Sequence, residues 1–236
     1  MKMKNHAADL AQYDPTEDDM DQTLLLDLST FDTRTIEQGT DLWKRVRLGH
    51  ITASNIATVM SKGKGSAEAI GRAKYKMQLV AERLTGTWAE SFSSDAMQWG
   101  VEQEQYACIA YEAREETMVD KTGFWLHPTI KWLGVSPDRL VGDGGLVEVK
   151  CPNTTTHIGY LFDKQVPSDY YKQIQCQLWV TGRAWCDFVS YDPRLPRRNQ
   201  LLVIRVERDE ELMEVMKAEV EQFLQEVENL IIQLER

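Results

Sequence analysis

Residues 132–152 read WLGVSPDRLVGDGGLVEVKCP, and this stretch decides the fold. Two short apolar runs flank a glycine-rich turn at 142–145, which is a pattern typical of a β-hairpin. Side chains alternate faces along a strand, so Glu148 and Lys150 point the same way. Asp138 ends the first run and can meet them from the neighbouring strand. Two carboxylates and an ammonium at one place suit hard divalent ions such as Mg²⁺ and metal-assisted phosphodiester hydrolysis.

This Asp…Glu-x-Lys pattern is the one that restriction-endonuclease-like nucleases carry. The competing interpretation is the exposed Glu/Lys face of an ordinary hairpin. Val147 and Val149 favour the nuclease, because they place apolar residues on the opposite face of the strand. Cys151-Pro152 then ends the strand, where we expect its charged residues to be exposed at an edge of the sheet.

Seven sequence blocks resemble those of lambda-type phage exonucleases, the viral recombinase branch of the restriction-endonuclease-like fold. In order, the blocks are EQGTDLW (37–43), RLGHITAS (47–54), WGVEQE (99–104), SPD (136–138), EVKCP (148–152), YKQIQ with WVT (171–175, 179–181) and YDPR (191–194). The resemblance covers residues 31–236. It implies an α/β fold with a restriction-endonuclease-like core, in which helices flank a mixed central β-sheet. We expect 31–236 to be a single nuclease domain.

The resemblance also implies an activity. It predicts a metal-dependent, processive 5′→3′ exonuclease on linear duplex DNA, which releases mononucleotides and leaves 3′ single-stranded overhangs for recombination. It further implies a ring-shaped homotrimer and a single-strand annealing protein as partner. Two alternatives stay open, an endonucleolytic or helicase-linked member of the same fold and a non-catalytic DNA-end-binding protein. Retention of Asp138, Glu148 and Lys150 argues against the second alternative.

The metal site is predicted from the hairpin and extended by the resemblance. Asp138 and Glu148 are the direct ligands, and the resemblance adds the backbone carbonyl of Val149. Lys150 is expected to orient the attacking water or to stabilise the transition state. Glu104, in the Trp-Gly-x-x-x-Glu block, could hold a second ion, although it could equally be a surface glutamate. We expect two Mg²⁺ ions, for which Mn²⁺ could substitute.

A second constellation is predicted to bind the 5′-terminal phosphate. In the family that the chain resembles, the positions of Arg47, Ser54, Ser136 and Gln173 cradle this group. Arginine offers a planar fork that matches phosphate oxygens, and hydroxyl and amide groups add neutral donors. From the sequence alone, Ser54 could be a helix cap and Gln173 a surface residue, with Gln175 as the neighbouring alternative.

Three further residues are candidates for DNA contacts. Lys62 and Lys64 lie in the basic, glycine-rich segment KGKGS (62–66), which is either a solvated linker or a mobile arm that touches phosphates. Met97 lies two residues before Trp99. By resemblance it wedges between the terminal bases, and the alternative is a core methionine.

The chain departs from the family pattern in two places. Arg139 follows the predicted metal aspartate, where relatives often carry glycine. Residues 1–30 have no recognised counterpart, and their seven acidic against two basic residues predict a flexible acidic tail.

Net charge is −10, yet it is concentrated at the two ends of the chain. Residues 1–30 carry −5 and residues 208–236 carry −6, whereas residues 31–207 carry +1. A near-neutral body with local basic patches can still track phosphates. The overall acidity therefore does not exclude a DNA partner.

Composition excludes several other classes. A chain of 236 residues is long enough to bury a core without disulfides. Its four cysteines form no C-x-x-C pair, which disfavours zinc and iron–sulfur sites and favours reduced thiols. We expect no signal peptide and no membrane span, and hence a cytoplasmic protein.

Periodicity and turn residues outline the remaining elements. Helices are expected near 41–47, from 52–54 onward, and near 67–84, 94–116, 154–162, 168–181 and 212–234. Strands are expected near 123–127, 132–135, 140–141, 146–150, 187–191 and 201–207, forming one mixed sheet.

Overall fold

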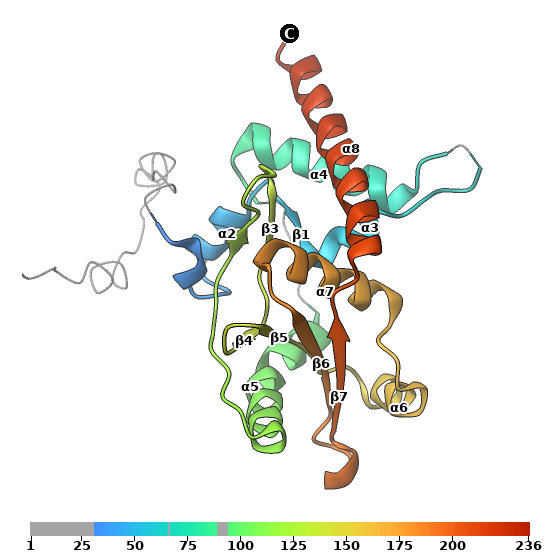
Figure 1. Cartoon of the computed structure of the whole chain (residues 1–236). Helices are drawn as coiled ribbons and strands as arrows, with labels where there is room; N and C mark the ends of the chain where they lie inside the picture. Colours follow the sequence, from blue (N-terminus) through green and yellow to red (C-terminus); the bar gives the residue numbers. More distant parts are fainter. Residues whose placement is uncertain (1–30, 66, 89–93) are drawn as a thin grey trace, which may run out of the picture. The chain divides into compact units, whose positions relative to one another are not determined.

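The computed structural model describes residues 31–65, 67–88 and 94–236. The chain divides into two units, Met1–Asp32 and Thr33–Arg236. The acidic tail expected at 1–30 lies outside the described residues. The second unit is a mixed α/β structure, which is the predicted fold class (Figure 1).

A four-stranded mixed sheet carries the hairpin, with strands in the order β4-β5-β6-β7. Its members are β4 (Arg139–Val141), β5 (Gly145–Lys150), β6 (Trp185–Tyr191) and β7 (Leu201–Glu207). β5 and β6 are parallel, and the other two pairings are antiparallel. A second sheet, ordered β1-β3-β2, contains β1 (Ile51–Thr52), β2 (Trp125–Leu126) and β3 (Leu133–Val135). The single sheet that we expected is therefore two.

The hairpin partner of β5 differs from the predicted one. The run at 132–135 forms β3, which pairs with β1 in the smaller sheet, and it is β4 that pairs with β5. Pro137 lacks a backbone N–H and restricts the residue before it, so it separates the two short strands. The turn then begins at Gly142, whose φ of +47° lies in the left-handed region.

β5 lies inside its sheet, between β4 and β6. Our expectation that its charged residues are exposed at a sheet edge is therefore wrong for Glu148, which is buried. The parallel partner β6 comes from a distant part of the sequence, so the hairpin alone did not reveal it. A carboxylate in this interior position must be satisfied by protein groups, because water does not reach it.

The helices occur close to their predicted positions. The α-helices are α2 (Asp41–Arg47), α3 (Ile56–Val59), α4 (Ile70–Thr85), α5 (Asp95–Glu115), α6 (Thr154–Asp163), α7 (Ser168–Thr181) and α8 (Glu210–Leu234). Short 3₁₀ turns are η4 (Thr33–Thr35), η5 (Ala53–Asn55) and η6 (Arg197–Asn199). Ser94 caps α5 by accepting from the N–H of Met97, and Gly86 ends α4 in the left-handed conformation.

Helices cover both faces of the four-stranded sheet. Cys108 and Tyr111 of α5 belong to one hydrophobic cluster with Val149 of β5. Ile174 of α7 belongs to another cluster, with Leu146 of β5. Alternate residues of β5 therefore face α5 and α7 in turn. The apolar stripe of α8 packs against α4 and belongs to one hydrophobic cluster with residues of the smaller sheet.

Within residues 31–65, 67–88 and 94–236, no helix combines the length and the apolarity that crossing a bilayer requires.

Candidate active site

Glu148 and Lys150 share one face of β5, as their spacing predicted. The Nζ atom of Lys150 donates a hydrogen bond to Oε1 of Glu148. Glu148 is 1% exposed, whereas the lysine side chain is 24% exposed. The ammonium is thus the more accessible member of the pair, and the carboxylate lies behind it.

Asp138 lies immediately before β4 and reaches across to β5. Its Oδ2 atom accepts a hydrogen bond from the backbone N–H of Val149 at 2.6 Å. Burial raises the pKa of Asp138 well above its usual range, and the charge of Glu148 raises it further against the opposing effect of Lys150. A cation would relieve the repulsion between these carboxylates, and carboxylate oxygens are the ligands that Mg²⁺ prefers. The donor set therefore fits a hard divalent ion.

Lys150 is held as an ammonium. Burial would lower its pKa, but the charges of Glu148 and Asp138 outweigh that effect and raise the pKa above its usual value. The Nζ atom also lies 4.9 Å from the ring centroid of Tyr170 on α7, within cation–π range. Lys150 therefore stays charged and is oriented by groups on two elements.

Two glutamines of α7 fix both oxygens of Glu148. Gln173 Nε2 donates to Oε1 at 2.6 Å, and Gln177 Nε2 donates to Oε2 at 2.7 Å. The sequence predicted Gln173 for a phosphate, and Gln177 was missed. Its signal was the i, i+4 spacing from Gln173, which places both amides on one helix face. Gln175, the alternative to Gln173, donates instead to the carbonyl of Glu207.

Glu104 projects from α5 and forms an ion pair with Arg139, with 2.7 Å between Oε1 and Nη1. Its charge also contributes to the raised pKa of Asp138, so the four candidate catalytic residues lie close together. In the described part of the chain, however, no three His, Cys, Asp or Glu side chains are gathered as a metal-ligand set. Arg139, the departure from the family pattern, engages the carboxylate that we expected to hold a second ion.

Arg47 lies at the end of α2 against two tryptophan rings. Its Cζ atom is 3.7 Å from the ring centroid of Trp43 and 5.9 Å from that of Trp88. Burial lowers the pKa of Arg47 to about 10, and its Nε atom has no hydrogen-bond partner. No carboxylate of the described chain forms an ion pair with it. A largely desolvated cation that forms no ion pair with the described carboxylates is suited to an anionic ligand.

Of the other residues predicted to bind the phosphate, only some are connected to Arg47 by contacts. Ser136 is linked to it through Trp43, whose Nε1 donates to Ser136 Oγ at 3.1 Å. Ser54 is exposed and contacts the hydroxyl of Thr52 at 3.2 Å. Its alternative interpretation as a helix cap is wrong, because neither η5 nor α3 has a side-chain cap.

The candidate DNA contacts lie at exposed positions. Lys62 forms an ion pair of 3.2 Å with Glu219 of α8, and its side chain is 81% exposed. Lys64 is exposed on the same loop. Met97 is 58% exposed in the first turn of α5, which rules out its interpretation as a core methionine.

This arrangement, a carboxylate pair with a lysine on a mixed sheet flanked by helices, defines a protein of the restriction-endonuclease-like fold. Residues 42–184 match the model of the YqaJ-like viral recombinase domain, and the chain belongs to this family. The resemblance noted in the sequence is thereby confirmed at the level of the family.

Solved structures of two bacterial proteins are similar to this chain. The alkaline exonuclease LHK-Exo from Laribacter hongkongensis is 45% identical, with a TM-score of 0.78, over 84% of this chain and 97% of that one. The same exonuclease in complex with dAMP matches with a TM-score of 0.79. A phage-related exonuclease from Haemophilus somnus 129PT is 16% identical, with a TM-score of 0.65, over 78% of this chain and 96% of that one, and supports the fold alone. No curated protein matches the chain.

Proposed function

We propose that this chain is a metal-dependent, processive 5′→3′ exonuclease. Its substrate is linear double-stranded DNA, from which it releases 5′-mononucleotides and leaves 3′ single-stranded overhangs for recombination. The observation that carries this proposal is the Asp138–Glu148 carboxylate pair with Lys150 beside it. The similarity to LHK-Exo, an alkaline exonuclease, supports the activity, and the dAMP bound to that protein supports a mononucleotide product.

Asp138, Glu148 and the carbonyl of Val149 would hold one Mg²⁺ or Mn²⁺ ion. Glu104 would contribute to a second ion if it exchanged its ion pair with Arg139 for a metal ligand. When bound, the ions neutralise phosphate charge and make water a better nucleophile at neutral pH. This chemistry needs ionised carboxylates. The raised pKa of Asp138 is that of the site without a cation, and a bound cation would favour the ionised carboxylate.

The other residues of the site orient the reacting groups and stabilise the charge that develops on the phosphate. Lys150 donates hydrogen bonds toward the attacking water or the developing phosphate charge, since its ammonium is the accessible member of the cluster. Gln173 and Gln177 prevent Glu148 from rotating, because each amide binds one carboxylate oxygen. A carboxylate fixed before the substrate arrives costs no reorganisation during the reaction.

The direction of digestion along the strand would be set by binding of the 5′-phosphate. Each cut exposes a new 5′-phosphate on the remaining strand, and a pocket that grips this group draws the next bond toward the carboxylates. Arg47 is the principal binding residue, with Ser136 beside it through Trp43 and with Ser54 and Gln173 as further donors. Gln173 would have to divide its amide between Glu148 and the phosphate.

Lys62, Lys64 and Met97 would contact the duplex beyond the site. Their exposure supports this role, with the lysines on backbone phosphates and the methionine between terminal bases. The ring-shaped homotrimer and the single-strand annealing partner, which the sequence resemblance implied, belong to the same proposal.

The proposal is tested with 5′-labelled linear duplex DNA and a circular duplex of the same sequence. With Mg²⁺, label should leave the linear substrate as mononucleotide while the circle stays intact, and EDTA should stop the reaction. Cleavage of the circle would instead establish the endonucleolytic alternative. End binding without any release of label would establish the non-catalytic one.

A second prediction concerns the 5′-phosphate. The wild type should digest 5′-phosphorylated ends about ten- to a hundredfold faster than 5′-hydroxyl ends, since a hydrogen bond to a charged group contributes about 1.5–3 kcal/mol. Arg47→Ala should erase most of this preference and shorten the tract degraded per encounter. Arg45→Ala, in the same helix, is the matched control and should keep the preference. Full preference in Arg47→Ala would place the pocket elsewhere, with Lys62 and Lys64 next to test.

A further inference from the structure

The segment between β6 and β7 leaves the sheet at the carboxyl end of β5, where the candidate active site lies. β5 and β6 run parallel, and Lys150 is the register partner of Ser190. β6 ends one residue later at Tyr191, and residues 192–200, which we call the β6–β7 loop, lead to the start of β7. The loop therefore begins beside the end of β5 that carries Glu148 and Lys150.

Polar side chains hold the backbone of this loop in place. The Gln200 amide donates to the carbonyls of Pro193 and Leu195, both at 2.8 Å. The fully buried His157 of α6 donates from Nε2 to the carbonyl of Asn199 at 2.9 Å. Two of these contacts lie within the loop and the third comes from α6, so the backbone of the loop is held in a defined conformation.

Arg194 ties the loop to the elements around the site. Its guanidinium pairs with the buried Asp192, with 2.7 Å between Nε and Oδ1, and its Nη2 donates to the carbonyl of Pro152 just after β5. Its Cζ atom lies 4.6 Å from the ring centroid of Trp99 on α5. The charge of Arg194 is thus satisfied inside the protein, and the residue serves as an anchor.

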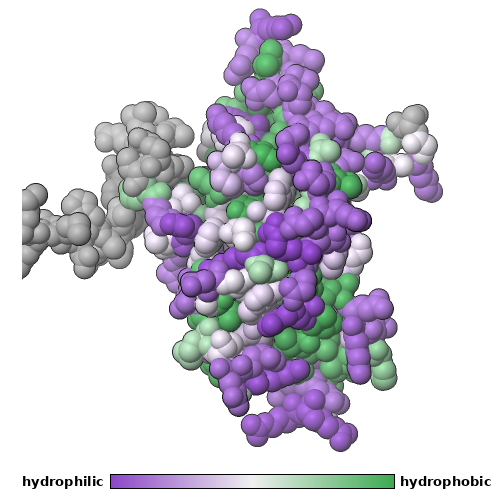
Figure 2. All heavy atoms as spheres, in the orientation of Figure 1, coloured by the Kyte–Doolittle hydropathy of each residue, from purple (hydrophilic) through white to green (hydrophobic). Residues whose placement is uncertain are grey.

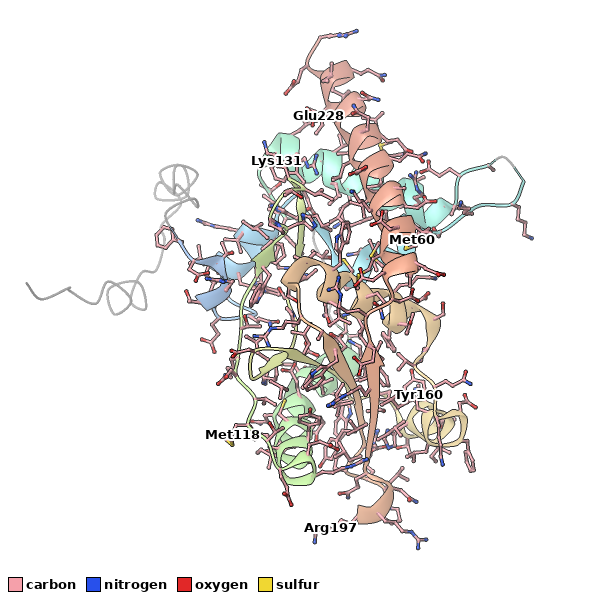
Figure 3. All side chains as sticks on the ribbon, viewed as in Figure 1. Met60, Met118, Lys131, Tyr160, Arg197 and Glu228 are labelled. Atoms are coloured by element: carbon pink, nitrogen blue, oxygen red, sulfur yellow. The ribbon has the colours of Figure 1, made fainter. Side chains whose placement is uncertain are left out.

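Arg197 and Arg198, in contrast, present free charges. Both are exposed, and in the described chain neither forms an ion pair with a carboxylate. Figure 3 shows Arg197 at the tip of the loop with its side chain directed into solvent, and this end of the molecule is hydrophilic in Figure 2. Adjacent guanidinium groups on a fixed backbone match the oxygens of neighbouring phosphates.

We propose that the β6–β7 loop is a phosphate-binding surface, on which Arg197 and Arg198 hold the DNA backbone beside the active site. The inference rests on the proposed nuclease function, which supplies the DNA. The phosphates belong either to the duplex ahead of the site or to the single strand left behind it. Both share the backbone chemistry that the arginines recognise, and the experiment separates them.

The test measures the affinity of the full chain for DNA in EDTA, where no cleavage interferes. The wild type and R197A/R198A are titrated with a 5′-phosphorylated duplex and with a single strand of equal length, over a range of salt concentrations. Each phosphate contact contributes about 0.9 to the slope of log affinity against log salt, so loss of two contacts lowers the slope by about 1.8 on B-DNA. At about 0.1 M salt, affinity should fall about ten- to a hundredfold.

The matched control is K131A/K217A, which removes the same charge elsewhere. Both lysines are exposed, and Figure 3 places Lys131 at the opposite end of the molecule from Arg197. A second variant, R197K/R198K, keeps the charge and should retain most of the salt slope, which guards against a folding defect. Loss on the duplex assigns the surface to the substrate, and loss on the single strand assigns it to the product.

Equal slopes and affinities for R197A/R198A and K131A/K217A on both probes would overturn the inference. A parallel digest of linear duplex with Mg²⁺ keeps the two proposals distinct. A wild type that binds DNA but releases no nucleotide contradicts the nuclease function and leaves the loop result standing. A wild type that digests DNA while the loop variant binds normally contradicts the loop inference alone.

Discussion

Asp138→Asn and Glu148→Gln should each abolish nucleotide release, with a loss of at least about a thousandfold in the single-turnover rate. Such a loss corresponds to about 4 kcal/mol of transition-state stabilisation. The amides keep the size of the side chains but lose the charge that holds a divalent ion. DNA-end binding should be unchanged or tighter, because one negative charge near the phosphate is gone.

Asp138→Asn also has a predicted effect on stability. Since the folded protein raises the pKa of Asp138, ionisation of this group destabilises the fold as pH rises past the pKa of the unfolded chain. At neutral pH without metal, the neutral amide should leave the melting temperature equal or higher. Asp143→Asn, on the exposed turn of the same hairpin, is the control and should digest DNA normally. Digestion by Asp138→Asn at near the wild-type rate would refute the metal site.

Lys150→Ala should lower the single-turnover rate by about a hundredfold or more while affinity changes by at most one phosphate contact. The reason is that Lys150 lies within the carboxylate cluster, where its charge acts on the reacting groups and not along the DNA backbone. Rapid-quench rates and end-binding titrations measured side by side separate the two effects.

Lys172→Ala supplies the comparison for Lys150. This lysine lies on α7 and pairs with Asp169 at 3.6 Å, so its removal should leave the chemical step intact. If Lys150→Ala lost affinity and kept its rate of cleavage, Lys150 would be a DNA-binding residue only.

Much of this site could be predicted because strand geometry is local. The two-residue period of a strand is enough to place Glu148 and Lys150 on one face, and the helix of Glu104 followed from its own pattern. The placement of β3 and β4 in different sheets was not predicted, since it depends on the pairing of β3 with β1, about eighty residues earlier in the chain. Pro137 indicated that the strand is interrupted, but a proline carries no information about which strand the next segment pairs with.

The hydrogen-bond and ion-pair partners that other elements supply to Glu148 and Glu104 could not be predicted from the sequence. Gln177 could be placed on the same helix face as Gln173, yet only the packing of α7 on the sheet shows that both reach Glu148. Arg139 was noticed as a departure from the family pattern, and its ion pair with Glu104 emerged from the approach of α5 to β4. Such contacts join residues far apart in the chain, where periodicity carries no information.

The interior position of β5 has a consequence for how the protein moves. Residues 145–147 of β5 are paired with β4 and β6, residues 148–150 are paired with β6 alone, and α5 and α7 cover the two faces of the strand. Fraying at helix ends or loss of the outer strand β7 leaves these pairings in place. Opening that exposes the amides of β5 to solvent exchange is therefore close to complete unfolding. The carboxylate of Glu148 and the ammonium of Lys150 therefore stay in register through smaller fluctuations of the surrounding elements.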